Sequence, residues 1–338
     1  MGLSAITDMP TARADGVADV YKGKVVRIIV GVAPGGLYDI HARLMARYLG
    51  KHLPGNPTVI VENMTGAGSL KATLYLYNAA PKDGTMLGVI GRGMSVNSLL
   101  DPETFNFDSR RFNWLGSTSR ESAMGVAWHT AAAKTFDQLF ATPLIVGATG
   151  AGDESASLPR MLNTLFNTKI KIISGYTGGT TVLAAMEKGE VEGRFWSWGS
   201  VKSERAQWLE EKKINLLVQV ALNKASDLPD TPFIMDYAKT DEQKQVLQLA
   251  LTGQSFAWPM LAPPGVPAET VAALRAGYKA AANDPAFLAE GKRANLSIIY
   301  VSGEEIHQLI DTAYAMPPDI IKRTKEIFAV EPAKPDAP

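Results

Sequence analysis

The stretch Gly31–Ile40, GVAPGGLYDI, follows directly on the apolar run Val25–Val30. The run predicts a buried strand, the paired glycines predict a turn, and the residues from Asp39 predict the start of a helix. A helix that begins after a glycine turn presents free backbone N–H groups, and its dipole favours an anion there. The stretch therefore predicts a strand–turn–helix unit whose turn can hold an anion.

The same order of strand, turn and helix repeats along the 338 residues, which suggests two domains with an α/β fold and parallel pairing. The imperfectly alternating segment 113–130 is where we expect the chain to leave the first domain. Predicted strands are 25–31, 58–63, 85–90, 143–150, 169–176, 192–198 and 214–222. Predicted helices include 40–49, 157–166, 180–188, 304–315 and 319–328.

The composition excludes several classes of function. Lysine plus arginine number 34 and aspartate plus glutamate 34, so the zero net charge gives no reason to expect nucleic acid or an anionic membrane as partner. The absence of cysteine removes thiolate chemistry and disulfides, and no apolar run is long enough to span a bilayer. The four histidines are scattered, and dinucleotide and P-loop motifs are missing, so we expect no metal and no cofactor.

Four glycine turns are candidates for anion binding: 34–36, 65–68, 148–153 and 176–180. One exposed helix end contributes only ~0.3–1 kcal/mol to the binding of an anion. Tight binding therefore requires several such ends or the exclusion of water. Two of the turns lie in each proposed domain, which favours a shared site over four unrelated turns.

Arginine and tryptophan side chains are candidates for the same site. Arg92 follows a strand end, Arg120 lies in the proposed crossover, and Arg194 lies close to Trp196 and Trp198. Arginine binds a carboxylate in bidentate fashion, and tryptophan stacks on flat ligands. The alternative for each arginine is a surface ion pair, and for each tryptophan it is packing in the core.

Six segments, in one order along the chain, match the motifs of a known family. They are APGGLYD (33–39), VIVENMTGAGS (59–69), AAPKDGTML (79–87), GYTGGTTVLAAMEKGEVEG (175–193), LPDTPFIMDYA (228–238) and LAPPGVPAETVAALRAGYKAAANDPAF (261–287). Each motif alone is weak, but their collinear order over roughly Lys24–Ala329 is specific. The chain thus resembles the solute-binding proteins of tripartite tricarboxylate transporters, the Bug-type periplasmic receptors.

This resemblance implies a two-lobed periplasmic binding protein fold of type II, in which each lobe is a mixed or parallel sheet flanked by helices and the ligand cleft lies between the lobes. Hinges are expected near 116–126 and 250–258. The implied division is an N-terminal extension 1–23 (a possible remnant of a trimmed leader), lobe one 24–124 with 254–330, lobe two 125–253, and a disordered tail 331–338.

The resemblance also implies that turn amides hold the carboxylate of an organic acid, while Asp39 braces the first turn. Implied or candidate ligand-binding residues are Gly35, Gly36, Leu37, Tyr38, Asp39, Arg92, Thr149, Gly150, Ala151, Gly152, Tyr176, Thr177, Gly178 and Trp196. The sequence departs from the family pattern at Thr177, Glu192 and Arg92, and in the strand GRFWSW. The added arginine and tryptophans favour a carboxylate on an aromatic or bulky scaffold.

The implied function is that of a periplasmic receptor, exported with a leader missing from this sequence, which delivers a small carboxylate to a membrane permease. We expect a monomer that carries out no chemistry. One alternative is an ABC-type or sensor-coupled receptor of the same fold. Another is an α/β enzyme in the same cleft, for which Asp153, Glu154 and His129 are the acid–base candidates.

Overall fold

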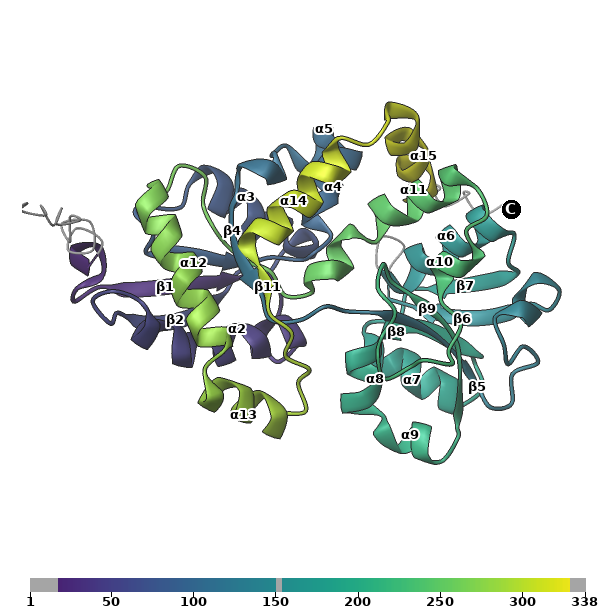
Figure 1. Cartoon of the computed structure of the whole chain (residues 1–338). Helices are drawn as coiled ribbons and strands as arrows, with labels where there is room; N and C mark the ends of the chain where they lie inside the picture. Colours follow the sequence, from purple (N-terminus) through teal and green to yellow (C-terminus); the bar gives the residue numbers. More distant parts are fainter. Residues whose placement is uncertain (1–17, 150–153, 329–338) are drawn as a thin grey trace, which may run out of the picture.

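The computed structural model describes residues 18–149 and 154–328, which form two lobes side by side (Figure 1). Lobe one contains a six-stranded sheet in the order β11-β4-β10-β3-β1-β2, and lobe two a five-stranded sheet in the order β7-β6-β8-β5-β9. The strands are β1 (Val25–Val30), β2 (Thr58–Asn63), β3 (Met86–Val89), β4 (Asn113–Ser117), β5 (Ala123–Trp128), β6 (Leu144–Ala148), β7 (Ile170–Ser174), β8 (Gly193–Ser197), β9 (Ile214–Val220), β10 (Met260–Ala262) and β11 (Val301–Ser302).

In lobe one, β1 pairs in parallel with β2 and β3. The connecting helices α2 (Leu37–Leu49) and α3 (Leu70–Asn78) make these strands the predicted β–α units. β10 and β11 both pair antiparallel with β4, so the sheet is mixed. The return helices α12 (Ala268–Ala282) and α13 (Pro285–Arg293) pack on α2.

Lobe two is also mixed, because the chain enters it through β5. This strand pairs antiparallel with β8 and β9, whereas β6 pairs in parallel with β7 and β8. The lobe's helices are α6 (Glu154–Phe166), α7 (Gly179–Glu187), α8 (Trp198–Glu204), α9 (Ala206–Glu210), α10 (Ile234–Tyr237) and α11 (Asp241–Ala250). Both α6 and α7 follow strands whose ends face lobe one.

The chain passes between the sheets in two adjacent segments, 118–122 and 251–259, which we call the crossing segments. They are joined by hydrogen bonds from Glu121 N–H to Gln254 O (2.8 Å) and from Ala257 N–H to Ser119 O (2.9 Å). The second segment includes a short 3-10 helix, η5 (Thr252–Phe256). Both crossing segments overlap the regions where the sequence predicts hinges.

The C-terminal helices make a third connection between the lobes. Helix α14 (Gly303–Tyr314) runs across lobe one, and α15 (Pro318–Phe328) lies over lobe two (Figure 1). Pro317 and Pro318 end α14, since the residue before a proline is disfavoured in the helical conformation. The predicted boundary places α15 in lobe one, but the helix packs on α6 and α11 as well as on α4 (Met94–Leu100).

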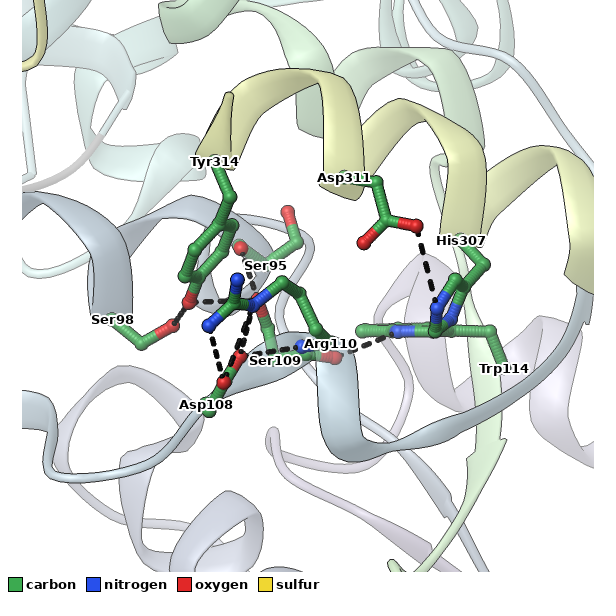
Figure 2. Close-up of polar contacts among 9 residues, drawn as sticks. All are labelled: Ser95, Ser98, Asp108, Ser109, Arg110, Trp114, His307, Asp311 and Tyr314. Atoms are coloured by element: carbon green, nitrogen blue, oxygen red, sulfur yellow. Dashed lines mark hydrogen bonds and ion pairs between the residues drawn. The ribbon is translucent and has the colours of Figure 1, made fainter. Parts of the chain in front are cut away.

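A polar cluster fixes α14 to lobe one (Figure 2). The Tyr314 hydroxyl lies 2.9 Å from Ser98 Oγ and accepts a hydrogen bond from Ser109 Oγ at 3.2 Å. Ser109 O accepts in turn from Trp114 Nε1 at 3.0 Å. The Arg110 guanidinium covers the Tyr314 ring at 4.3 Å from its centroid. These contacts fix the end of α14, and therefore the direction in which α15 leaves lobe one.

Three helix starts differ most from those predicted, whereas α7, α14 and α15 begin within one residue of the predicted positions. Helix α2 begins at Leu37, two residues before Asp39, because Gly36 takes an extended conformation and serves as its N-cap. Helix α6 is already helical at Glu154. Trp198 begins α8 instead of ending a strand, since the Ser197 side chain accepts a hydrogen bond from Ser200 N–H and caps the helix.

The described residues contain neither a candidate membrane span nor a candidate metal cluster. Within 18–149 and 154–328, no helix combines the length and apolar character needed to cross a bilayer. The same residues contain no group of three or more histidine, cysteine, aspartate or glutamate side chains positioned to hold a metal ion.

The packing of α15 predicts a stability effect far from the cleft. Ile327 is 2% exposed and lies in the core cluster that α15 shares with lobe two. Ile327→Ala should lower the free energy of unfolding by ~2–5 kcal/mol in urea titrations, because it leaves a cavity in that core. The exposed Lys322→Ala on the same helix is the control, with an expected change of under ~0.5 kcal/mol. Equal stabilities for the two variants would contradict the assignment.

Candidate functional site

A cavity of about 350 Å³ lies between the lobes beside the crossing segments. Both lobes and both crossing segments contribute to its walls. Lobe one supplies the first turns of α2 and a loop at 295–299, and lobe two supplies α8 and a loop at 222–227. Residues that line the cavity include Leu37, His41, Arg120, Glu121, Trp198, Lys202, Asp227 and Trp258.

The turn before α2 is braced by the carboxylate of Asp39, which is 3% exposed. It accepts hydrogen bonds from Gly35 N–H, Arg43 Nε and Asn63 Nδ2, each at 2.9 Å. Burial alone would raise the pKa of Asp39, but the bonds from Arg43, Gly35 and Asn63 hold it below the usual value. Gly35 has φ +86°, which is strained for any residue with a side chain. This contact is the bracing expected for Asp39.

The next three amides, of Gly36, Leu37 and Tyr38, meet no backbone or side-chain acceptor within the part of the chain that the structure describes. The first backbone bond of this turn runs from Ile40 N–H to Gly36 O. Glycine at the N-cap has no side chain with which to satisfy these donors. Leu37 is among the residues that line the cavity, whereas Gly36 and Tyr38 are not. The positive end of the α2 dipole therefore lies beside the space between the lobes, where it can receive a carboxylate.

An aromatic cluster around Trp258 forms the adjacent wall. Tyr38 meets the Trp258 ring edge-on at 4.6 Å between centroids, and His41 stacks on it at 5.5 Å. His41 Nδ1 lies 2.9 Å from Thr118 Oγ1. Burial lowers the pKa of His41 to about 3, so the imidazole is neutral at physiological pH. The wall therefore offers an apolar, uncharged surface beside the open amides.

Sequence reasoning did not single out Trp258. It lies in a proline-rich stretch, and its sequence context does not distinguish it from a core tryptophan. Its position at the cleft follows from contacts with residues more than 200 positions earlier in the chain. The sequence offers one weak signal, since the residue falls at the end of the predicted hinge 250–258.

In lobe two, the predicted turn amides are partly engaged. Thr149 N–H donates to Ser155 Oγ at 3.1 Å, and Gly178 N–H donates to Thr181 Oγ1 at 3.2 Å. Tyr176 packs against the core of lobe two, and Thr177 is exposed. Three further predicted residues lie outside the described residues: Gly150, Ala151 and Gly152. The turn before α2 and the start of α7, where the Gly179 and Thr180 amides meet no acceptor among the described residues, thus both keep open amides. The α2 turn differs in that its Leu37 lines the main cavity.

Arg92, predicted to hold a ligand carboxylate, is bound to a carboxylate of the protein itself. Its Nε donates to Glu154 Oε1 at 2.9 Å, and its Nη2 pairs with Glu154 Oε2. Arg92 belongs to lobe one and Glu154 to α6 of lobe two, so the pair crosses the cleft. Burial alone would lower the pKa of Arg92, but Glu154 and Tyr38 beside it raise that pKa above its ordinary value.

The other two candidate arginines also have partners. Arg120 Nη2 donates to Glu305 Oε1 at 2.6 Å and lines the main cavity. Arg194 Nη1 donates to Gly179 O at 3.0 Å, and its guanidinium covers the Trp196 ring at 4.8 Å. The pairing of Arg120 with Glu305 is the ion-pair alternative that the sequence left open for this arginine.

The two tryptophans near Arg194 take different positions. Trp196 lines a second cavity of about 130 Å³ together with Glu154 and Arg194, and its ring contacts Trp208 in the core of lobe two. Trp198 lines the main cavity, and its Nε1 donates to Asp227 Oδ2 at 3.0 Å. Trp198 therefore lines the same cavity as Trp258, a position that the sequence did not assign to it.

The candidate acid–base residues are not gathered into one site. Glu154 is paired with Arg92, and His129 follows the far end of β5, where its N–H donates to Lys213 O. Asp153 lies outside the described residues. Within the ranges that the structure covers, these residues form no nucleophile–base–acid arrangement of the kind needed for general catalysis.

The buried His41 predicts a pH effect on stability. Its pKa is about 3 in the folded protein and near 6.5 when unfolded, so its stabilising contribution is complete above pH 6.5 and is lost as pH falls toward 3. Between pH 6 and 4.5 the free energy of unfolding of the wild type should fall more steeply than that of His41→Gln, by up to ~1.4 kcal/mol per pH unit. Urea titrations at several pH values measure this difference. Parallel curves for the two proteins would show that His41 is protonated in the fold.

No model of a known protein family matches the chain. A curated protein, the UPF0065 protein in the TAR-I ttuE-ttuC' intergenic region of Agrobacterium vitis, is 29% identical over 180 residues. These residues are 52% of this chain and 51% of that protein, so the match spans about half the length of the relative.

Solved structures cover almost the whole chain. The periplasmic binding protein BugD aligns with a TM-score of 0.64 and 19% identity, over 91% of this chain and 98% of its own. A TctC solute-binding protein from Polaromonas aligns with a TM-score of 0.69 and 17% identity, over 91% and 98%. A protein of Rhodopseudomonas palustris solved with adipate aligns with a TM-score of 0.65 and 17% identity, over 90% and 97%.

These likenesses, together with the two mixed sheets and the cavity between them, confirm the fold expected from the six sequence motifs. At identities of 17–19%, similarity to a solved structure establishes the fold but does not identify the ligand. The chain has the two-lobed, type II periplasmic binding protein fold of the Bug and TctC solute-binding proteins.

Proposed function

We propose that the protein is a periplasmic receptor that captures a small organic carboxylate between its lobes and delivers it to a permease of the tripartite tricarboxylate type. The observation that carries this proposal is the first turn of α2, whose unsatisfied amides lie beside the interlobe cavity that Leu37 lines. An anion at this position gains from both the N–H donors and the helix dipole.

The surroundings of this turn favour a carboxylate on an apolar or aromatic body. Trp258 and Trp198 both line the cavity, and Leu37 lies at the turn itself. Tryptophan provides a large apolar surface for a ligand that packs between two lobes. The cavity of about 350 Å³ falls within the range typical of small-molecule sites.

The comparisons support the same class of ligand. The Rhodopseudomonas palustris structure was solved with adipate, a dicarboxylate, and the Polaromonas protein is a solute-binding protein. Both share the two-lobed arrangement with this chain. We therefore propose a monomeric receptor without cofactor or catalytic activity, which closes on its ligand by rotation at the crossing segments.

Ligand linkage gives the first test. Purified protein is heated with a panel of mono-, di-, tri- and aromatic carboxylates, and its melting temperature is compared with that of the ligand-free protein. A true ligand at 100 times its Kd should stabilise the fold by ~2.7 kcal/mol. Failure of every acid in the panel to raise the melting temperature would contradict the proposed function.

Removal of one amide tests the turn itself. Leu37 is the first residue of α2, where proline is compatible with the helix, and Gly36 before it is extended (φ −83°, ψ 170°), as proline requires. Leu37→Pro deletes one N–H donor. The affinity for the carboxylate should fall by ~10–100-fold, because the net free energy of a hydrogen bond to a charged group corresponds to a change in Kd of about that size.

The matched control is Leu37→Ala, which removes the side chain but keeps the N–H, and should lose much less affinity than Leu37→Pro. Calorimetric titration of the acid found in the panel compares the two. Equal losses would assign the effect to the side chain and remove the amide from the site.

A further inference from the structure

The ion pair between Arg92 and Glu154 joins the two lobes across the cleft. Arg92 is 7% exposed, whereas the Glu154 side chain is about half exposed, at 45%. Both carboxylate oxygens are engaged, which is the bidentate geometry that arginine uses to bind a ligand carboxylate. Glu154 therefore occupies a position that a free acid could also fill.

The arginine is the fixed member of this pair. Its N–H donates to the Tyr38 hydroxyl at 3.0 Å, and its carbonyl accepts from Ser95 Oγ at 2.6 Å. Its guanidinium lies 5.7 Å from the centroid of the Trp258 ring. Arg92 is thus anchored by the same Tyr38 and Trp258 that stand beside the open amides of α2. Glu154, at the first turn of α6, is the more exposed partner and gains a small benefit from that helix's dipole.

Two other cations that line the main cavity are matched by acids of the protein in the same way, whereas Lys224, which also lines it, is exposed and has no ion pair among the described residues. Lys202 pairs with Asp227 at 2.7 Å and Arg120 with Glu305 at 2.6 Å. A ligand with one carboxylate at the α2 turn leaves all these pairs intact. A ligand whose second carboxylate reaches Arg92 must displace Glu154. One that turns toward Lys224 leaves the Arg92–Glu154 pair intact, but it meets an exposed ammonium, and ion pairs in solvent contribute little.

Displacement of Glu154 is unfavourable for two reasons. Glu154 is attached to the fold, so it competes for Arg92 at an effective concentration in the millimolar range or above. Once displaced, its carboxylate stays close to the incoming anion, and like charges near each other in a cleft repel. A dicarboxylate therefore gains little from Arg92 while Glu154 is present.

We propose that Glu154 is a specificity-determining residue: by occupying the Arg92 site from within the chain, it makes the cleft select acids with one carboxylate over dicarboxylates of the same length. This inference rests on the proposed function, since it assumes that the first carboxylate binds at the α2 turn. It goes beyond that function by naming the charge class of the ligand and the residue that sets it.

The test compares acids that differ only in the second carboxylate: hexanoate with adipate, and benzoate with terephthalate. Kd is measured by calorimetry for the wild type and for Glu154→Gln. The wild type should bind the monocarboxylate of a pair at least ten times more tightly than the dicarboxylate. Glu154→Gln should bind the dicarboxylate at least ten times more tightly than the wild type does, while its affinity for the monocarboxylate changes by less than threefold.

Glu290→Gln is the matched control. It removes the same charge from an ion pair within lobe one, with Arg47, whereas Glu154 joins the two lobes and lines the second cavity. Both affinities should stay within twofold of the wild type. Glu154→Asp is the second cleft variant, because it keeps the charge and the helix end but shortens the side chain by one methylene. It should move the selectivity in the same direction as Glu154→Gln by a smaller factor.

The outcomes separate this inference from the function on which it rests. Binding of dicarboxylates by the wild type as tightly as monocarboxylates, or unchanged selectivity in both Glu154 variants, would overturn the role of Glu154 while leaving a carboxylate receptor. If neither the wild type nor any variant binds any of the four acids, the role of Glu154 is overturned. The melting-temperature panel of carboxylates then decides whether the proposed receptor function is contradicted as well.

Discussion

The carboxylate of Asp39 is the interaction on which the cleft depends. A helix end that is to bind a ligand must leave its amides unsatisfied, yet an unsatisfied turn has little to hold its shape. The Asp39 carboxylate stabilises the turn by accepting a hydrogen bond from one turn amide, that of Gly35, while it also accepts hydrogen bonds from the side chains of Arg43 and Asn63. Gly36 then caps α2 without a side chain, so the amides that follow stay open beside the cavity.

The sequence predicted the fold well because its signals are local. The apolar run Val25–Val30, the glycine turn after it and the Ser302 cap of α14 each depend on a few neighbouring residues, and each is present as expected. The roles of Trp258 and Glu154 depend instead on segments that are distant in sequence and meet only in the folded chain. No local pattern could predict that the partner of Arg92 is an acid 62 positions away.

The charges of the cleft follow one arrangement. Its arginines are anchored and paired, the neighbouring His41 is kept neutral by burial, and the described turn amides that remain open are uncharged donors. An anion in such a site is held by dipoles that are already oriented, so binding requires little reorganisation. Unpaired buried cations would hold an acid more strongly but would also be costly to desolvate while the site is empty.

The first crossing segment connects this cleft to the movement of the lobes. Arg120 is tied to Glu305 of lobe one, whereas the adjacent Glu121 accepts hydrogen bonds from Ser197 Oγ at 2.5 Å and Gly199 N–H at 3.3 Å in lobe two. Successive residues are thus anchored to opposite lobes, which concentrates any rotation in the backbone between them. Since Glu121 holds the start of α8, which bears Trp198, such a rotation would carry one wall of the cavity with it. A closure of this kind would couple the rotation of the lobes to the fit around a ligand through the buried carboxylate of Glu121.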